Sequence, residues 1–242
     1  MISASSKIVI VGGSSGIGLG VAHAARELDA KLVLVGRSQA KLDAARGALA
    51  APAAVETIAA DVTKEDDVAR MFERVGAFDH LVITRGVPPV EAPVEAFDMD
   101  AVRAFIDTMV VSAVTVTKHA RGKLRSTGSI IFTSGISKDK PPTQGGSVVA
   151  AVAGSFTYLA RALALELAPI RVNVVSPGWV KTPMWDELAG EGKTALWQQM
   201  AERLPAGHIA TPAEIAKAYL YLMDSTFTTG TTLHIDGGHA LI

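Results

Sequence analysis

The sequence contains no cysteine, which excludes a disulfide framework, a thiolate zinc site and a thiol nucleophile. It also lacks an excess of charge, since 23 lysines and arginines stand against 24 aspartates and glutamates. A chain so nearly neutral attracts neither phosphate backbones nor acidic membrane surfaces. The six histidines do not show the paired spacing of metal ligands. We therefore expect no protein-bound metal ion and no nucleic-acid partner.

Long apolar segments are missing as well. The longest uncharged stretch, residues 141–160, begins with PPTQGG, so its apolar remainder is too short to cross a bilayer. The first six residues are short and polar, without the charged and apolar sections of a signal peptide. These absences predict a cytoplasmic protein that has no membrane partner.

The 242 residues, of which 49% are apolar, are predicted to form one domain spanning 1–242. Short β-branched runs alternate with longer segments that are rich in alanine and leucine and have helical spacing. Continuous apolar strands separated by helices indicate an α/β fold, with a doubly wound parallel sheet and helices on both faces. The expected strands are residues 8–11, 32–35, 55–59, 81–83, 130–132, 172–175 and 232–236.

Two of the expected helices begin with capping residues. Thr211, Pro212 and Glu214 have the pattern of a capping box with proline in the first helical position. Thr63 precedes an acidic turn that includes Asp66, which predicts a second capped helix start. Both patterns place helices between strands, as a parallel sheet requires.

A glycine-rich turn directly follows the first expected strand. Residues 12–18 read GGSSGIG and lead into a helical segment. Glycines in this arrangement permit a tight turn and let the backbone approach a diphosphate at a helix N-terminus. A loop that merely needs positive φ is the alternative, but the position between a strand and a helix favours a dinucleotide site.

The end of the second expected strand carries no carboxylate that could bind the ribose hydroxyls of NAD. Arg37 and Ser38 stand there instead. A guanidinium can make paired, charge-assisted hydrogen bonds to the 2′-phosphate of NADP. The alternative is a solvated arginine at the start of a loop. We expect NADP(H) rather than NAD(H) as the cofactor.

Several further motifs resemble those of the short-chain dehydrogenase/reductase family. Besides the glycine turn, Asp61 and Val62 match the pair that holds adenine, residues 173–183 match the loop beside the nicotinamide, and residues 235–238 match the C-terminal IDGG. The resemblance covers the chain from first strand to last turn and implies a Rossmann fold. It assigns the cofactor contacts to Gly12, Ser14, Ser15, Gly16, Ile17, Gly18, Arg37, Ser38, Asp61, Val62, Thr84, Gly86, Pro177, Gly178, Val180 and Thr182.

The same resemblance implies four catalytic positions that this sequence does not fill. The family uses a tyrosine as proton donor, a lysine that lowers the pKa of that tyrosine, a serine and an asparagine. Alignment of the helix around residues 159–168 places these positions on Val149, Ala153, Gly135 and Met109. Ser134, beside the serine position, is the one remaining catalytic candidate, and a shift of the alignment by one residue would place it there.

Other residues could replace the missing groups or shape the substrate pocket. Tyr158 lies nine residues beyond Val149, on the opposite face of the helix, so we expect it to pack in the core. Arg85 follows the fourth expected strand and could either clamp an anionic substrate group or point into solvent. A helical segment is expected at about residues 184–204, on the substrate side of the pocket, with Trp185 and Trp197 as apolar walls.

Three functions remain open at this point. The first is an NADP(H)-dependent oxidoreductase that acts on carbonyl or alcohol groups of an unknown small molecule, with an unorthodox proton donor or none. The second is a catalytically inert NADP(H)-binding sensor or partner subunit, and the third is a structural subunit with a vestigial pocket. The resemblance also implies a homodimer or homotetramer, paired through the helix that contains the small residues Ala150, Ala151, Ala153 and Gly154.

Overall fold

The computed structural model describes residues 1–242, and its centre is a seven-stranded sheet in which all neighbouring strands are parallel. The strand order is β3-β2-β1-β4-β5-β6-β7, so the chain winds outward from β1 and then returns to its other side. Every run predicted as a strand is one, which confirms the doubly wound α/β fold. The strands are β1 (Lys7–Val11), β2 (Lys31–Gly36), β3 (Val55–Ala59), β4 (Phe78–Ile83), β5 (Leu124–Thr133), β6 (Arg171–Pro177) and β7 (Thr232–Ile235).

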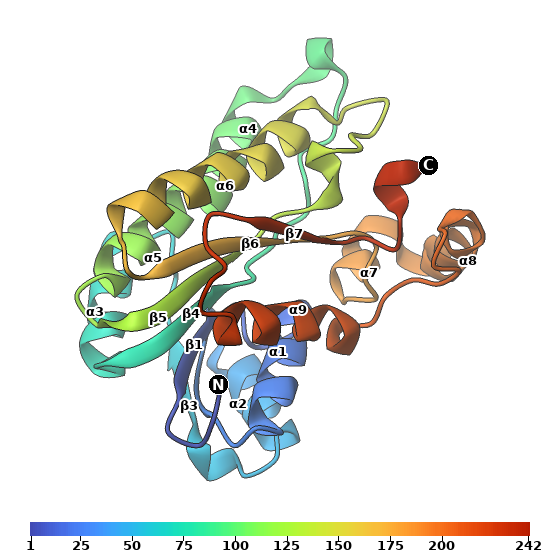
Figure 1. Cartoon of the computed structure of the whole chain (residues 1–242). Coiled ribbons are helices and arrows are strands. Elements are labelled where there is room, and N and C mark those ends of the chain that lie inside the picture. Colours follow the sequence, from blue (N-terminus) through green and yellow to red (C-terminus); the bar gives the residue numbers. More distant parts are fainter.

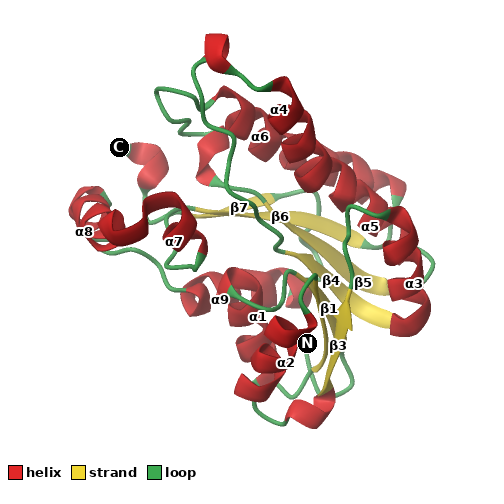
Figure 2. Cartoon of the chain, turned by 180° about the vertical axis from the view of Figure 1, so that it is seen from behind, coloured by secondary structure: helices red, strands yellow, loops and turns green.

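Helices cover both faces of the sheet (Figure 1). Figure 2 shows the same two layers from behind. One face carries α1 (Gly16–Arg26), α2 (Gln39–Ala48) and α9 (Pro212–Asp224). The other face carries α3 (Glu65–Val75), α4 (Met99–Ile106), α5 (Ser112–Ala120) and α6 (Ser147–Glu166). Two further helices, α7 (Met184–Ala189) and α8 (Lys193–Arg203), follow β6 and replace the single helical segment expected at 184–204.

Alternation of side chains along the central strands creates two separate cores. In β1, Ile8 and Ile10 belong to the core under α1, α2 and α9, whereas Val9 and Val11 belong to the core under α3, α5 and α6. All four side chains are buried. A strand buried on both faces has to be apolar throughout, which is why these runs could be read from the sequence.

One of the two predicted helix caps is present in the structure and the other is not. Thr211 and Glu214 form the predicted capping box at the start of α9. Thr63 does not cap α3, because its hydroxyl donates a hydrogen bond to the Asp61 carboxylate, 2.7 Å away, and the helix begins two residues later at Glu65. The Thr63 hydroxyl thus bonds to the Asp61 carboxylate instead of to a free backbone amide of the helix.

The helix α6 is the one helix long and apolar enough to cross a membrane, judged by length and composition alone. Its inner face, which includes Phe156 and Ala160, is buried against the sheet. Tyr158 is 71% exposed rather than packed in the core, so that prediction was wrong. The side of α6 opposite Val149 faces away from the sheet, where the guanidinium of Arg161 lies over the Tyr158 ring.

Candidate functional site

The glycine turn joins the carboxyl end of β1 to the amino end of α1. Gly12 and Gly16 have φ angles of +87° and +52°, in the left-handed region that favours glycine. A Cβ on Gly18 would lie 2.2 Å from the Gly12 carbonyl oxygen, so no other residue fits there. The turn therefore brings backbone amides and the start of α1 to the point where the strand order reverses, which is the usual place for a phosphate group.

A cavity of about 290 Å³, here called the glycine-turn cavity, opens beside this turn. Arg37, Ser38 and Lys41 line it after the end of β2. The Ser38 hydroxyl accepts a hydrogen bond from the Lys41 amide, which caps α2 and holds the lysine on the first helical turn. The sequence interpretation included Arg37 and Ser38 but missed Lys41. Its position, three residues after the capping serine and four after Arg37, could have indicated a second cation at this site.

The predicted adenine pair is divided by the structure. Val62 lines the glycine-turn cavity, whereas Asp61 is not among its lining residues. The Asp61 carboxylate accepts hydrogen bonds from the amide and hydroxyl of Thr63, which lower the pKa of Asp61. The Asp61 amide donates to the Asp67 carboxylate at the start of α3. Asp61 thus fixes the loop that presents Val62.

A second cavity, of about 350 Å³, lies over the carboxyl ends of β4, β5 and β6. We call it the tryptophan cavity, because Trp179 and Trp185 line it with their rings stacked 4.5 Å apart. The two cavities share part of their lining, so one elongated ligand could extend through both. The shared residues are Ile17, Thr84, Arg85, Gly86, Thr182 and Met184.

The loop after β6 contributes Pro177, Gly178, Val180 and Thr182 to the tryptophan cavity. A Cβ on Gly178 would lie 2.7 Å from the Asp236 Cα, so this turn also requires glycine. The Thr182 hydroxyl is buried and has no hydrogen-bond partner within the protein. A polar group of a ligand in the shared passage would satisfy it, which fits a dinucleotide whose nicotinamide end carries an amide.

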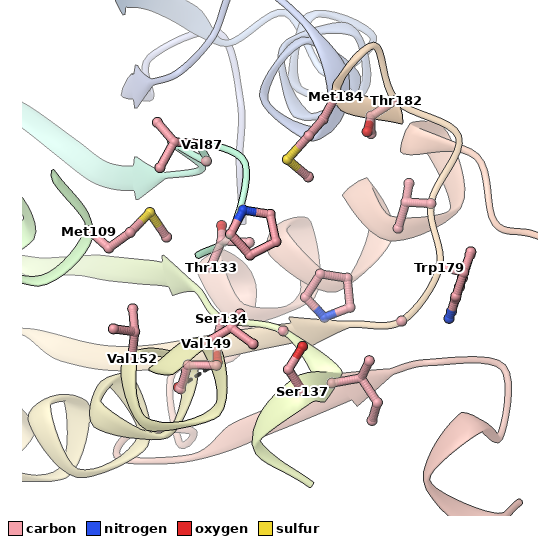
Figure 3. Close-up of a pocket in the computed structure, with 18 of the residues that line it drawn as sticks. Val87, Met109, Thr133, Ser134, Ser137, Val149, Val152, Trp179, Thr182 and Met184 are labelled. Atoms are coloured by element: carbon pink, nitrogen blue, oxygen red, sulfur yellow. Dashed lines mark hydrogen bonds between the residues drawn. The ribbon is translucent and has the colours of Figure 1, made fainter. Parts of the chain in front are cut away.

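The four positions that the resemblance assigns to catalysis all lie in the tryptophan cavity. Met109, Gly135, Val149 and Ala153 line its wall, and Figure 3 shows Val149 and Val152 of α6 beside Ser134. Met109 lies across the cavity, in a π-helical turn (Asp107–Val111) that joins α4 to α5. None of these four side chains can donate or accept a proton.

Two hydroxyl groups near this wall, those of Ser134 and Thr133, are committed to other partners. Ser134 donates its hydroxyl hydrogen to the backbone carbonyl of Ala153, at 2.7 Å. Thr133 is hydrogen-bonded to the hydroxyl of Tyr219, at 2.6 Å. Tyr219 is fully buried in the core between the sheet and α1, α2 and α9, and this burial raises the pKa of its phenol far above the usual value. Ser134 keeps lone pairs for a ligand but has no free proton to give.

Arg85 does not point into solvent, which was one of its two predicted orientations. It is half-buried, lines both cavities, and donates from Nη1 to the carbonyl oxygen of Thr108, at 3.0 Å.

Trp197 was expected in the pocket wall, but it packs beside Met200, Leu204 and Ile209 instead. Trp179, which belongs to the loop that the resemblance places beside the nicotinamide, lines the cavity together with Trp185.

Comparisons with known proteins cover nearly the whole chain. The family model described as "Enoyl-(Acyl carrier protein) reductase" matches residues 11–240. The "Short-chain dehydrogenase/reductase ucsE" of Acremonium sp is 33% identical over 251 residues, which cover 96% of this chain and 94% of that protein.

Solved structures agree with this similarity. The structure of "MalC Reductase/Diels-Alderase from Malbranchea aurantiaca" matches with a TM-score of 0.91 and 27% identity, covering 98% of this chain and 97% of that chain. A "small-chain dehydrogenase in complex with NADPH" matches with a TM-score of 0.84 and 29% identity, covering 98% and 99%. With its parallel sheet and glycine turn, the chain belongs to the short-chain dehydrogenase/reductase family of oxidoreductases.

Proposed function

We propose that this chain binds NADP(H) and catalyses hydride transfer with a small molecule that draws no proton from the protein. The observation that carries this proposal is the wall of the tryptophan cavity, where Met109, Gly135, Val149 and Ala153 offer no acid or base. A positioned general acid contributes about 10²- to 10⁴-fold to a rate. Its absence therefore restricts the substrate more than it prevents the reaction.

The residues present fit a dinucleotide that extends through both cavities. The amides of the glycine turn and the start of α1 would hold the diphosphate. Arg37, Ser38 and Lys41 would hold a 2′-phosphate, and no carboxylate lines the glycine-turn cavity to favour the free ribose hydroxyls of NAD. Thr182 would meet the polar end of the nicotinamide. When bound, the nicotinamide supplies or accepts the hydride.

The protein's part in the reaction is to orient the substrate and exclude water. Val149, Val152, Phe156 and the stacked tryptophans present apolar surface to the substrate. Ser134 keeps its proton on the Ala153 carbonyl and can only accept a hydrogen bond from the substrate. An oxyanion formed beside Val149 and Ala153 would find no proton donor on the wall that α6 provides.

These properties favour an acceptor that is already positively charged. In an iminium group the hydride adds to carbon, the C=N π electrons move onto nitrogen, and the product is a neutral amine that needs no proton. The face of an indole also stabilises a cation. We therefore propose as the substrate class an iminium or a similar cationic carbon, carried on an apolar molecule and held beside the stacked tryptophans and Glu91 rather than beside Arg85.

Cofactor binding is tested first, by titrating the protein with NADPH and NADH while following tryptophan fluorescence. Trp179 directly follows Gly178 in the lining of the tryptophan cavity, so its emission should respond. We expect dissociation constants in the micromolar range for NADPH and a weaker affinity for NADH. Failure of both to bind at millimolar concentration would overturn the proposal.

Turnover is tested next, by following NADPH consumption with cyclic iminium salts and with ketones of matched shape. Reduction of the iminium compounds and not of the ketones is the expected result. Faster reduction of the ketones would contradict the proposed substrate class, since it would require a proton donor in the cavity.

The apolar wall favours a second candidate, in which the chain binds NADP(H) without turning it over. Such a protein would act as a sensor or a partner subunit, and it would bind NADPH but consume none with either substrate class. The Malbranchea enzyme is described as a Diels-Alderase as well as a reductase, and a cycloaddition also needs no acid or base. Cycloaddition of a diene to a dienophile in the same molecule, without loss of NADPH, would identify such a cyclase.

A further inference from the structure

Arg85 is a half-buried cation that forms no salt bridge, although the Asp61 carboxylate is near enough to raise its pKa. Five other arginines form salt bridges with aspartates, but Arg85 forms none. Its hydrogen bonds all come from Nη1, which donates to the carbonyl of Thr108 at 3.0 Å and approaches the hydroxyl of Ser112 at 3.5 Å. Its Nε and Nη2 donors have no partner in the protein. A partly desolvated guanidinium with free donors, in the lining of two cavities, is expected to meet an electron-rich ligand.

The guanidinium is anchored toward the tryptophan cavity. Thr108, which accepts its hydrogen bond, belongs to the π-helical turn that also carries Met109. Met109 lines the tryptophan cavity and not the glycine-turn cavity, whereas Arg37 and Lys41 line only the glycine-turn cavity. Three cations thus follow the path of a dinucleotide, two at the adenosine end and Arg85 further along.

Other charges around the tryptophan cavity do not cancel that of Arg85. Lys140 and Glu91 line the cavity with opposite charges, and burial lowers the pKa of His239, which favours its neutral form. Burial and the charge of Arg37 lower the pKa of Arg85 and the Asp61 carboxylate raises it, with a net lowering, but a guanidinium stays protonated at neutral pH. The wall formed by α6 contributes no charge to the cavity.

We propose that Arg85 faces the nicotinamide half of the bound dinucleotide and makes the chain prefer the reduced cofactor over the oxidised one. The oxidised ring carries a positive charge and the reduced ring does not, so a fixed cation disfavours the oxidised form. This inference rests on the proposed binding of NADP(H). It assigns Arg85 to the redox state of the cofactor, and Arg37 with Lys41 to its 2′-phosphate.

The test compares Arg85→Gln, Arg85→Lys and the matched control Arg37→Gln by calorimetric titration. The probes are NADPH, NADP⁺ and adenosine 2′,5′-bisphosphate, which is the adenosine half alone. For Arg85→Gln we expect unchanged affinity for the bisphosphate and a ratio of NADPH to NADP⁺ affinity that falls by about tenfold. Arg85→Lys retains the charge and should retain the ratio. Arg37→Gln should weaken all three probes and leave the ratio unchanged.

The outcomes separate this inference from the proposed function. Binding of the bisphosphate also shows that a variant is folded, and Arg85→Lys tests the charge even where the glutamine variant is unstable. Two results would overturn the role of Arg85 while leaving the proposed function intact. One is an unchanged ratio of NADPH to NADP⁺ affinity in Arg85→Gln. The other is a loss of bisphosphate affinity in Arg85→Gln as large as that in Arg37→Gln. If the unmodified protein bound neither NADPH nor NADP⁺, the proposed function itself would fail.

Discussion

Val149 and Ala153 determine how little acid–base chemistry the tryptophan cavity can perform. Both side chains line the cavity from the first turns of α6, and Val149 is labelled there in Figure 3. Their spacing of four residues puts them on the same face of the helix, one turn apart. A phenol and an ammonium placed there would lie close enough to interact, which is the arrangement that lowers a tyrosine pKa.

Restoring this pair should therefore create carbonyl reduction. We expect the double variant Val149→Tyr with Ala153→Lys to consume NADPH with a ketone at least about 100-fold faster than the unmodified protein, because it regains a general acid. The matched control is Val149→Phe with Ala153→Lys, which fills the same space without the hydroxyl. Equal rates in the two double variants would show that the added phenol does not act as a proton donor.

His80 makes stability depend on pH. It is 8% exposed in β4, where its Nδ1 is hydrogen-bonded to the hydroxyl of Ser129, at 2.9 Å. Burial lowers the pKa of His80 to about 4, from an ordinary value of 6.5. The unfolded chain thus binds a proton before the folded chain does. The contribution of His80 to stability is complete above pH 6.5 and is lost as the pH falls through 4.

We expect the free energy of unfolding to decrease by about 3 kcal/mol between these pH values because of His80 alone. Urea unfolding of the unmodified protein and of His80→Gln, measured across this range, gives the difference. Glutamine keeps a partner for Ser129 but does not titrate. Two curves that stay parallel across the range would refute this assignment.

At the scale of elements, the start of α9 is held by a cap that the sequence already displays. Thr211 and Glu214 bond to each other's backbone amides, and Glu214 also accepts from His208, at 2.8 Å. These hydrogen bonds, that of the Thr211 amide first, lower the pKa of Glu214 to about 2. The start of α9 packs closely on α1, since a Cβ on Gly20 would lie 2.7 Å from the Pro212 carbonyl oxygen. The cap thus supports the helix that begins at the glycine turn.

Removal of this cap should cost stability. Thr211→Ala is expected to lower the free energy of unfolding by about 1 kcal/mol, as measured by urea denaturation. Thr226→Ala is the control, because Thr226 is exposed and forms no side-chain hydrogen bond, so its effect should stay within about 0.5 kcal/mol. Similar losses in both variants would mean that the cap contributes nothing.

At the scale of the whole molecule, the outer face of α6 exposes large apolar side chains to solvent. Leu165 is 85% exposed on this apolar helix, and Tyr158 lies two turns away on the same exposed side. Val111, at the end of the π-helical turn, and Val114, in the α5 helix that follows it, are exposed as well. Apolar side chains gathered on one face of a fold mark a contact surface. We propose that two copies of the chain pair through this face.

Light scattering after size-exclusion chromatography tests the pairing. The unmodified protein is expected to elute as a dimer or tetramer, and Leu165→Glu as a smaller species, because a buried unpaired carboxylate opposes association. Leu241→Glu is the matched control, since Leu241 is an equally exposed leucine, at 84%, near the C-terminus. A monomeric unmodified protein would contradict the proposal.

The parts of the molecule that depend on local pattern could be predicted from the sequence. Seven strands, the capping box at Thr211 and the glycine turn each depend on residues within a few positions of one another. Two errors show the limit of such reasoning. Thr63 was expected to cap α3 but bonds to Asp61, and Tyr158 was expected in the core but lies on the surface. Neither outcome can be predicted from local pattern. The first depends on a carboxylate that competes for the threonine hydroxyl, and the second depends on which side of the helix the sheet covers.

The sequence by itself determined the α/β fold, the glycine turn and the residue types at the positions of Val149 and Ala153. Only the tertiary structure decided which side chains meet in one cavity, because β4, β5, α6 and the loop after β6 come together from distant parts of the chain. It alone directed Arg85 to the Thr108 carbonyl and tied the Ser134 proton to Ala153. Packing and hydrogen bonding between such distant segments depend on the whole fold, and a local pattern does not contain them.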